Sequence, residues 1–324
     1  MTEAVNADQV TVCVCTHNPR RDVLRSCFEA IAAQRDAAGL SVLVVDNRSQ
    51  PPLGADDVAP LTAAGLPVRI VCEERLGNVH ARARAIADSD SPWILFVDDD
   101  NELAPDYVAR GLATIAANPA LGCFGGRLFL PAGTEVPRWL QPLLSFVAIR
   151  DYGDRPDVRC EMRDGPWIPA TAGAFVRRPV AERYRARVAS DPVVANLGRK
   201  GRRGLGSCED TLMMFGGCGL GYYSGYEPTL RLVHHLDPRR FTFGYMVRLM
   251  YGYGRSLVQL DRLTGGEQDP APVLETGPTP SRRDSWFGRK LKRGTQAARY
   301  ALPYAACLLA LQVGMALERR TQQR

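Results

Sequence analysis

The sequence predicts an α/β protein in which helices flank a mostly parallel sheet and a helical appendage follows at the carboxyl end. Three observations support this fold class. Apolar runs of strand length alternate with helical stretches in the first third, helical periodicity returns later, and an apolar segment beside basic residues lies near the end. The chain has 324 residues, of which 45% are hydrophobic, so it can bury a large core and is not intrinsically disordered.

The first third predicts four strands joined by three helices. The strands are expected over residues 10–15, 41–45, 68–72 and 93–97, and the helices near residues 22–33, 56–64 and 78–87. Such an alternation produces parallel strands whose carboxyl ends share one edge of the sheet. Open sheets of this kind bind ligands at that edge.

The second part of the chain is less regular. Residues 121–176 contain short apolar runs interrupted by glycine and proline, and helical periodicity returns near residues 209–215 and over residues 241–260. We therefore expect a main domain over residues 1–262, a linker rich in glycine and proline over residues 263–281, and a basic and apolar helical tail over residues 282–324.

The tail contains an apolar stretch, residues 301–317, that is interrupted by Pro303 and Gln312. Its length is at the short end of the roughly 17–25 residues that span a bilayer. We rank a peripheral membrane helix first, a helix packed on the main domain second, and a membrane span third. Basic residues and Trp286 and Phe287 nearby suit a headgroup boundary, so the tail predicts peripheral membrane contact.

Charge and cysteine usage narrow the location and the partners. The net charge of +6 is mild and the basic residues cluster late, so we expect no nucleic-acid partner. The nine cysteines lack the short paired spacing of zinc sites, and Cys13, Cys15 and Cys72 lie in apolar runs, which predicts small buried side chains in a reducing compartment. Residues 1–9 do not resemble a secretory signal, so we expect a cytoplasmic protein, at the inner face of the membrane if the tail binds there.

Three carboxylates form the most informative cluster in the sequence. Asp98, Asp99 and Asp100 directly follow the apolar run over residues 93–97, and no basic residue stands beside them. Oxygen ligands of this kind suit Mg²⁺ or Mn²⁺, which are commonly held by one or two carboxylates and by substrate phosphates. The sequence therefore predicts a cation carrying a phosphate group, and the alternative is an exposed acidic turn that caps the next helix.

Seven segments in order then resemble the family 2 glycosyltransferases, which have the GT-A fold of nucleotide-diphospho-sugar transferases. They are VTVCVCTHNP at 10–19, VLVVDN at 42–47, RLGNVHAR at 75–82, WILFVDDD at 93–100, TAGAFVRR at 171–178, SCEDTLMM at 207–214 and YEPTLRLVHH at 226–235. The resemblance runs from about Val10 to Ser256. It implies a nucleotide-binding half over residues 10–120 and an acceptor half over residues 121–262.

The resemblance implies roles on the donor side for five residues. Thr16 and Asp46 would line the pocket for the base and ribose, and Arg82 would reach the nucleotide or its diphosphate. Asp98 would face the ribose, and Asp99 would lie with it in the donor site. These positions imply a UDP-, GDP- or dTDP-sugar as donor.

The resemblance implies the metal and catalytic groups as well. Asp100 would bind Mn²⁺ or Mg²⁺, and Asp210 would be the catalytic base with Glu209 as its partner. His234 or His235 would complete the metal site. Because adjacent residues of a strand face opposite ways, at most one of the two can do so, and we favour His234.

These assignments predict an inverting, metal-dependent glycosyltransferase that moves a sugar from a nucleoside-diphosphate donor to a hydroxyl of a glycan, a lipid-linked acceptor or a small molecule. One alternative is a nucleotidyltransferase with the same acidic metal site, although the first strand is not followed by a basic glycine-rich loop. A non-catalytic nucleotide-binding protein is the other. A dinucleotide site is disfavoured, because no G-x-G-x-x-G turn follows the first strand.

Overall fold

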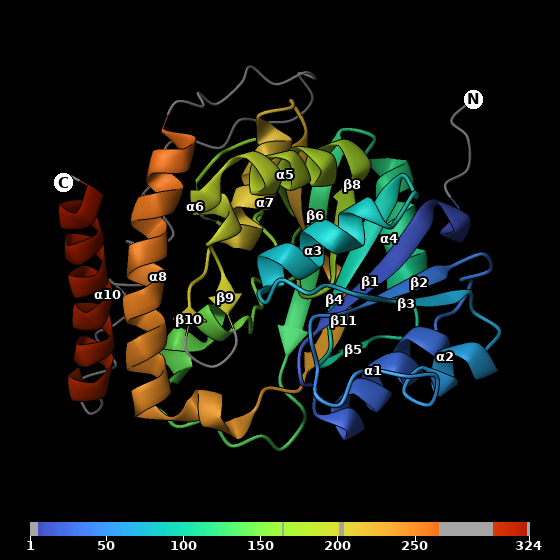
Figure 1. Cartoon of the computed structure of the whole chain (residues 1–324), viewed down its shortest axis with the longest axis horizontal. Coiled ribbons are helices and arrows are strands. Elements are labelled where there is room, and N and C mark those ends of the chain that lie inside the picture. The colour runs from blue at the N-terminus through green and yellow to red at the C-terminus, as the bar shows by residue number, and fades with distance from the viewer. Residues whose placement is uncertain (1–5, 164, 201–203, 266–300, 323–324) are drawn as a thin grey trace.

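The computed structural model describes residues 6–163, 165–200, 204–265 and 301–322, and a nine-stranded sheet forms its middle layer (Figure 1). The strands of this sheet are β1 Val10–Thr16, β2 Ser41–Asp46, β3 Val68–Cys72, β4 Trp93–Asp98, β5 Asn101–Leu103, β6 Leu121–Phe129, β7 Asp157–Arg159, β8 Ala174–Arg177 and β11 Tyr223–His234. Two short strands, β9 Arg199–Lys200 and β10 Gly204–Leu205, pair separately. The predicted fold class is confirmed.

The sheet changes character along its strand order, which is β3-β2-β1-β4-β8-β6-β11-β5, with β7 added to β11. The first four strands in this order are parallel, as the alternating pattern predicts. Beyond them, β8 runs antiparallel to both β4 and β6, and β5 runs antiparallel to β11. The antiparallel strand β5 starts three residues after the end of β4, so the acidic cluster lies in the tight connection between them.

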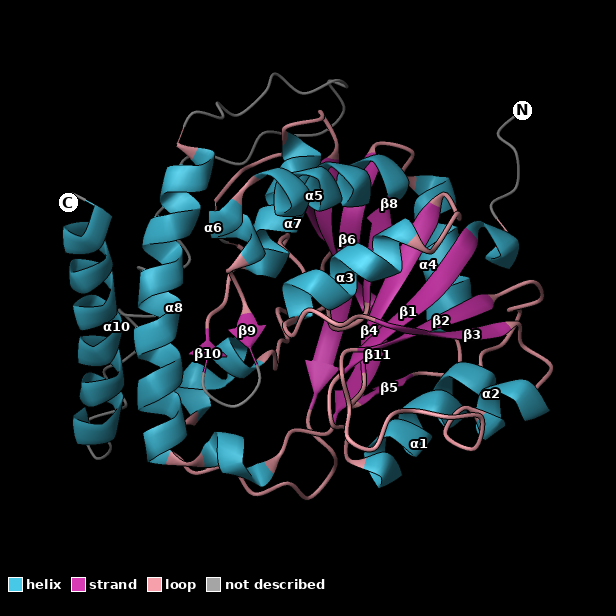
Figure 2. Cartoon of the chain, viewed as in Figure 1, coloured by secondary structure: helices cyan, strands magenta, loops and turns pink. Residues whose placement is uncertain are grey.

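Helices cover both faces of the sheet (Figure 2). One face packs against α1 Arg21–Ala32, α2 Ala59–Ala63 and α4 Tyr107–Ala117, and the other against α3 Asn78–Ala87, α5 Arg178–Ser190 and α7 Glu209–Cys218. Side chains alternate between the two cores, since Val12 and Val14 of β1 face the first and Cys13 faces the second. The short elements η1 Ala7–Gln9, η2 Gln141–Val147, α6 Pro192–Ala195 and η3 Pro238–Phe241 complete the domain.

Two details differ from the sequence prediction. The helix expected near residues 56–64 is only α2, because a turn held by Asp57 precedes it: the Asp57 carboxylate accepts a hydrogen bond from the Gly54 backbone N–H at 2.8 Å and pairs with Arg21. The prediction of a buried Cys72 is wrong. It lies on β3, the edge strand of the sheet, and is exposed.

The last described helix packs on the main domain. Helix α10, Ala301–Gln322, lies alongside α8, Phe243–Thr264, at one end of the molecule (Figure 1). The two backbones approach closely, because a Cβ added at Gly254 would lie 2.1 Å from the Leu311 carbonyl oxygen, and one at Gly314 would lie 2.2 Å from that of Tyr251. Packing on the domain is the alternative ranked second for the tail.

Much of the predicted linker and the basic cluster, with Trp286 and Phe287, lies outside the described residues. Helix α8 continues to Thr264, two residues past the predicted domain boundary at residue 262. Among the described residues, none of the helices combines the length and the apolar character needed to cross a bilayer.

Candidate active site

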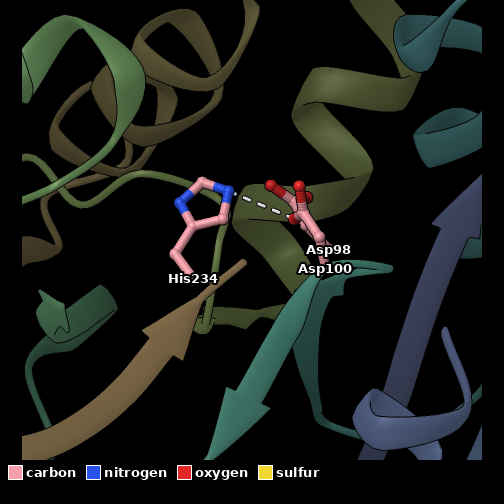
Figure 3. A group of neighbouring side chains, drawn as sticks. All are labelled: Asp98, Asp100 and His234. Carbon is pink, nitrogen blue, oxygen red and sulfur yellow. Dashed lines mark ion pairs between the residues drawn. The ribbon is translucent and has the colours of Figure 1, made fainter. Parts of the chain in front are cut away.

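Three side chains from two separate strand ends converge beside the sheet edge (Figure 3). Asp98 ends β4, Asp100 follows it, and His234 ends β11. Each offers one ligand atom within 4.8 Å of the others, and His234 Nε2 lies 3.1 Å from Asp100 Oδ1. The pairing of β11 with β5 causes this meeting, since it sets His234 opposite Asn101. Asp100 and His234 are the predicted metal ligands. Asp98, which was expected to face the ribose, lies in the same cluster as a third potential ligand.

The two adjacent histidines face different partners. The Nδ1 atom of His234 lies 3.3 Å from the Ala148 carbonyl oxygen, an arrangement that directs Nε2 toward the carboxylates. His235 instead places Nε2 2.9 Å from Glu102 Oε1. The side chains of these two adjacent residues at the end of β11 therefore point to different partners, as expected for a strand. His234 is the one that lies beside the acidic cluster.

A cationic group that the sequence analysis missed lies behind this cluster. Arg240 of η3 places Nη2 3.8 Å from Asp100 Oδ2. Burial works to raise the pKa of Asp100, but the neighbouring His234 and Arg240 outweigh it and hold that pKa below its ordinary value. The signal was present in the sequence, because the pair Arg239-Arg240 follows the two histidines by four residues.

Thr16 and Asp99 meet on the donor side as a pair. The Thr16 hydroxyl at the end of β1 donates a hydrogen bond to the Asp99 carboxylate. Burial, and then the nearby charge of Asp100, raise the pKa of Asp99 to about 7. Loss of hydration and a neighbouring carboxylate both disfavour the charged form of Asp99.

Asp46 stands apart from the other predicted residues. It is buried at the end of β2, and its two oxygens accept hydrogen bonds from the backbone N–H groups of Ser49 and Leu53, each at 2.9 Å. These bonds hold the loop that follows β2. Each carboxylate oxygen can accept a further hydrogen bond, so a role toward a nucleotide base stays a prediction.

The predicted catalytic pair begins helix α7. Cys208, directly before it, is buried with a left-handed backbone at φ 71°, a conformation that is costly for a non-glycine residue and that turns the chain into the helix. Glu209 is then buried against Arg82, with 2.7 Å between its Oε1 and Arg82 Nη1, and also accepts a hydrogen bond from Asn78. The Asp210 carboxylate accepts the backbone N–H of Thr211 at 2.8 Å.

Arg82 connects this helix with the acidic cluster. Its Nη2 lies 3.7 Å from Asp98 Oδ1, in addition to the contact with Glu209. Burial, and then the charge of Asp210, raise the pKa of Glu209, against the effect of Arg82. Burial disfavours the charged form of Arg82, but Glu209 and Asp98 outweigh this and raise its pKa. In the described structure Arg82 is held by two carboxylates, where the sequence predicts a contact to the donor.

A cavity of about 240 Å³ adjoins these groups. Five of the predicted residues line it, namely Arg82, Asp98, Glu209, Asp210 and His234. The lining also includes Phe146, Tyr152 and Tyr253 from the second part of the chain. Thr16, Asp46, Asp99 and Asp100 are not among the lining residues. Potential metal ligands and the Asp210 carboxylate at the start of α7 therefore line the same cavity.

The sequence matches a known family over more than half of its length. The matching profile is described as glycosyl transferase family 2 and covers residues 11–184. The chain belongs to this family. Membership of this family favours the first of the three functional hypotheses raised by the sequence, which is glycosyl transfer.

Curated relatives agree with this assignment over part of their length. An N-acetylglucosaminyltransferase of Rhizobium sp. (strain N33) is 34% identical over 139 residues, which are 42% of this chain and 30% of the relative. An uncharacterized glycosyltransferase of Haemophilus influenzae is 28% identical over 136 residues, 39% of this chain and 50% of the relative. The chain therefore aligns with half or less of the length of either relative.

Solved structures share the GT-A fold. The mannosyltransferase PcManGT from Pyrobaculum calidifontis, in complex with GDP-Man and Mn²⁺, superposes with a TM-score of 0.52 at 18% identity, over 98% of this chain and 78% of that one. GalNAc-T7 with UDP, GalNAc and Mn²⁺ also gives 0.52 at 13% identity, over 82% and 49% of the two chains. At these identities the likeness concerns the fold.

Proposed function

We propose that this glycosyltransferase is inverting and depends on a divalent metal, and that it moves a sugar from a nucleoside-diphosphate donor to an acceptor hydroxyl. The observation that carries the proposal is the meeting of Asp98, Asp100 and His234 beside the cavity that Asp210 also lines. Residues 10–120 would bind the nucleotide and residues 121–262 the acceptor.

The ligand atoms of these three side chains fit Mn²⁺ or Mg²⁺. Two carboxylates supply hard oxygen ligands, and a neutral imidazole is also acceptable to Mn²⁺. The contact between His234 Nδ1 and the Ala148 carbonyl would keep Nε2 available as a ligand. A cation bound there would neutralise the charge that develops on the departing diphosphate.

Asp210 is the proposed general base. In the reaction the acceptor oxygen forms a bond to the anomeric carbon, the bond from that carbon to the diphosphate oxygen breaks, and the hydroxyl proton passes to the Asp210 carboxylate. A direct displacement of this kind inverts the anomeric centre. Glu209 is a positioning residue, because its carboxylate is buried and engaged with Arg82 and Asn78.

The donor is proposed to lie along Thr16, Asp98 and Asp99, with Asp46 behind the base pocket. UDP-N-acetylglucosamine is the first donor to test, since several curated relatives bear the name N-acetylglucosaminyltransferase. GDP-mannose and dTDP-sugars complete the panel of donors. The acceptor would be a glycan, a lipid-linked sugar or a small molecule that enters past Tyr152 and Tyr253.

We also propose a cytoplasmic enzyme whose tail touches the inner face of the membrane. Leu309, Val313 and Leu317 recur every four residues along α10 and are all exposed, so they form an apolar stripe on the side away from α8. Co-sedimentation with phosphatidylglycerol vesicles should occur and should weaken when Leu309 and Val313 are both changed to Gln. Equal sedimentation of the two proteins would contradict membrane contact through this stripe.

The central test measures binding and turnover separately. Thermal-shift measurements with the donor panel, with and without Mn²⁺, should show a metal-dependent rise in Tm for one donor class. Asp210→Asn should keep this rise and lower kcat by at least about 10²-fold, because it removes a proton acceptor. The exposed Asp90→Asn is the matched control. If Asp210→Asn turned over at the rate of Asp90→Asn, Asp210 would not be the base.

A further inference from the structure

Two cysteines far apart in the sequence meet at the side of the acceptor half. Cys160 directly follows β7 and is half-buried, and Cys218 is the last residue of α7 and is buried. The Cys218 thiol donates a hydrogen bond to the Cys160 sulfur across 2.7 Å. The Cys160 thiol also lies 3.8 Å from the carbonyl oxygen of Cys218. The two sulfur atoms therefore already lie together in the thiol state.

Regular structure holds both cysteines in place. The residue before Cys160, Arg159, pairs with Ser224 in the β7 to β11 ladder. After Cys218 the chain turns through two backbone hydrogen bonds, from Gly221 to Cys218 and from Tyr222 to Gly217. Because strand pairing fixes the backbone before Cys160 and a turn fixes it after Cys218, the two sulfur atoms are held near each other.

The other cysteines have different surroundings. The Cys27 thiol donates to the Asp98 carbonyl oxygen at 3.6 Å, and Cys123 Sγ lies 3.1 Å from the Ser224 hydroxyl. Cys72 is the exposed cysteine and lies beside Glu74. Cys160 and Cys218, by contrast, share a sulfur-to-sulfur hydrogen bond, so we expect selective chemistry at this pair.

We propose that Cys160 and Cys218 form a reversible disulfide when a low-molecular-weight disulfide such as oxidised glutathione is the oxidant. The half-buried Cys160 thiolate attacks the oxidant and releases one glutathione thiol, leaving a mixed disulfide. Cys218 then attacks the Cys160 sulfur and releases the second. One sulfur–sulfur bond forms in the protein, the oxidant's own sulfur–sulfur bond breaks, and two protons pass from the cysteines to the two glutathione thiolates.

The bond would tie a wall of the cavity to the catalytic helix. Cys160 lies in the segment between Tyr152 and Ala170, whose ends both line the cavity, and Cys218 ends the helix that starts at Glu209. The link joins residues that are 58 positions apart in the sequence, so it restricts the unfolded chain considerably. It consumes none of the groups proposed for metal binding or proton transfer. Its test is therefore independent of the proposed glycosyl transfer.

The first experiment counts and locates thiols in the full-length chain. After reduction, nine thiols should react under denaturing conditions, and incubation with oxidised glutathione followed by its removal should leave seven. Trypsin should then release residues 160–163 linked to residues 204–231. The second peptide also contains Cys208, so fragmentation must place the bond at Cys218. Nine remaining thiols, or a bond to Cys208, would overturn the proposal.

The second experiment measures stability with matched variants. The oxidised chain should have a Tm roughly 5 °C or more above that of the reduced chain, because the cross-link removes entropy from the unfolded state. Cys160→Ser should abolish the difference, and Cys72→Ser should keep it. Should Cys160→Ser fold poorly, Cys218→Ala serves the same purpose. If the oxidised wild-type chain had two thiols fewer than the reduced chain but the same Tm, a stabilising link between Cys160 and Cys218 would be excluded.

Discussion

The two halves of the candidate site are built in different ways. The donor side comes from β1, β2 and β4, which pair in uninterrupted parallel register, and its acidic cluster begins at the last residue of β4. The other side comes from α7, β11 and η3, three successive elements of different kinds that lie far along the chain from β1, β2 and β4. There, residues with left-handed backbones, Ala148 and Cys208, hold the groups that meet the acidic cluster. The donor side is thus specified by regular strands, and the other side by turns.

The largest expected effect concerns whether the two halves share one metal. Asp100→Asn changes the donor side and His234→Gln changes the other side. Each should lower metal-dependent turnover by at least about 100-fold and weaken Mn²⁺ binding, because each removes a ligand. His235→Gln is the control, since its ring faces Glu102. If His234→Gln behaved like His235→Gln, the metal would be held by the donor side alone.

The next effect concerns the buried connection between the halves. Arg82→Met should lower the free energy of unfolding by about 3–5 kcal/mol, because it leaves Glu209 buried without its cation. Urea denaturation provides the measurement. Arg84→Met on the same helix is the control, as the Arg84 side chain is only partly buried and pairs with Asp88. Adding Glu209→Gln to Arg82→Met should recover part of the loss, and no recovery would argue against the pair.

A smaller effect is expected where α10 docks. Gly314→Val should lower the free energy of unfolding by about 1–3 kcal/mol, because the new side chain would collide with the Tyr251 carbonyl. Ala316→Val adds similar bulk to the exposed face of the same helix and should cost less. Guanidinium denaturation compares the two variants. Equal stabilities would mean that α10 does not pack on α8 in solution.

The smallest effect is dependent on pH. Burial works to raise the pKa of Glu318, but hydrogen bonds from Gln259 and Arg255 outweigh it and lower that pKa from its ordinary value of 4.5. The carboxylate therefore stabilises the fold above about pH 4.5 and loses this contribution as pH falls through the lower folded-state pKa.

Glu318→Gln should cost about 1 kcal/mol at pH 7, allowing for the partly exposed Arg255, and much less near pH 3. Urea denaturation of the variant and the wild type at both pH values gives the difference. A cost that stayed constant with pH would show that charge at Glu318 does not support docking of α10.

Sequence periodicity predicted the regular half in detail. The helix expected over residues 78–87 is α3 itself, and the strand over residues 93–97 extends by one residue to Asp98. Such patterns succeed because the alternation of apolar side chains is a local property of neighbouring residues. The order of motifs also sufficed to indicate the family before any contact was known.

The contacts between distant segments were not predictable in the same way. Arg240 and Asn78 were missed because each acts on a residue more than 100 positions away in the sequence. The exposure of Cys72 depends on β3 lying at the sheet edge, which its own sequence does not reveal.

By itself, the sequence determined the class of fold, the family, and the acidic cluster at the end of a buried strand, since all three are written in neighbouring residues and their order. Only the tertiary structure decided that Asp98 joins Asp100 and His234, that Arg82 is held between two carboxylates, and that Cys160 meets Cys218. The physical reason is that these contacts depend on how strands pair and helices pack across the whole domain, and no local pattern encodes that arrangement.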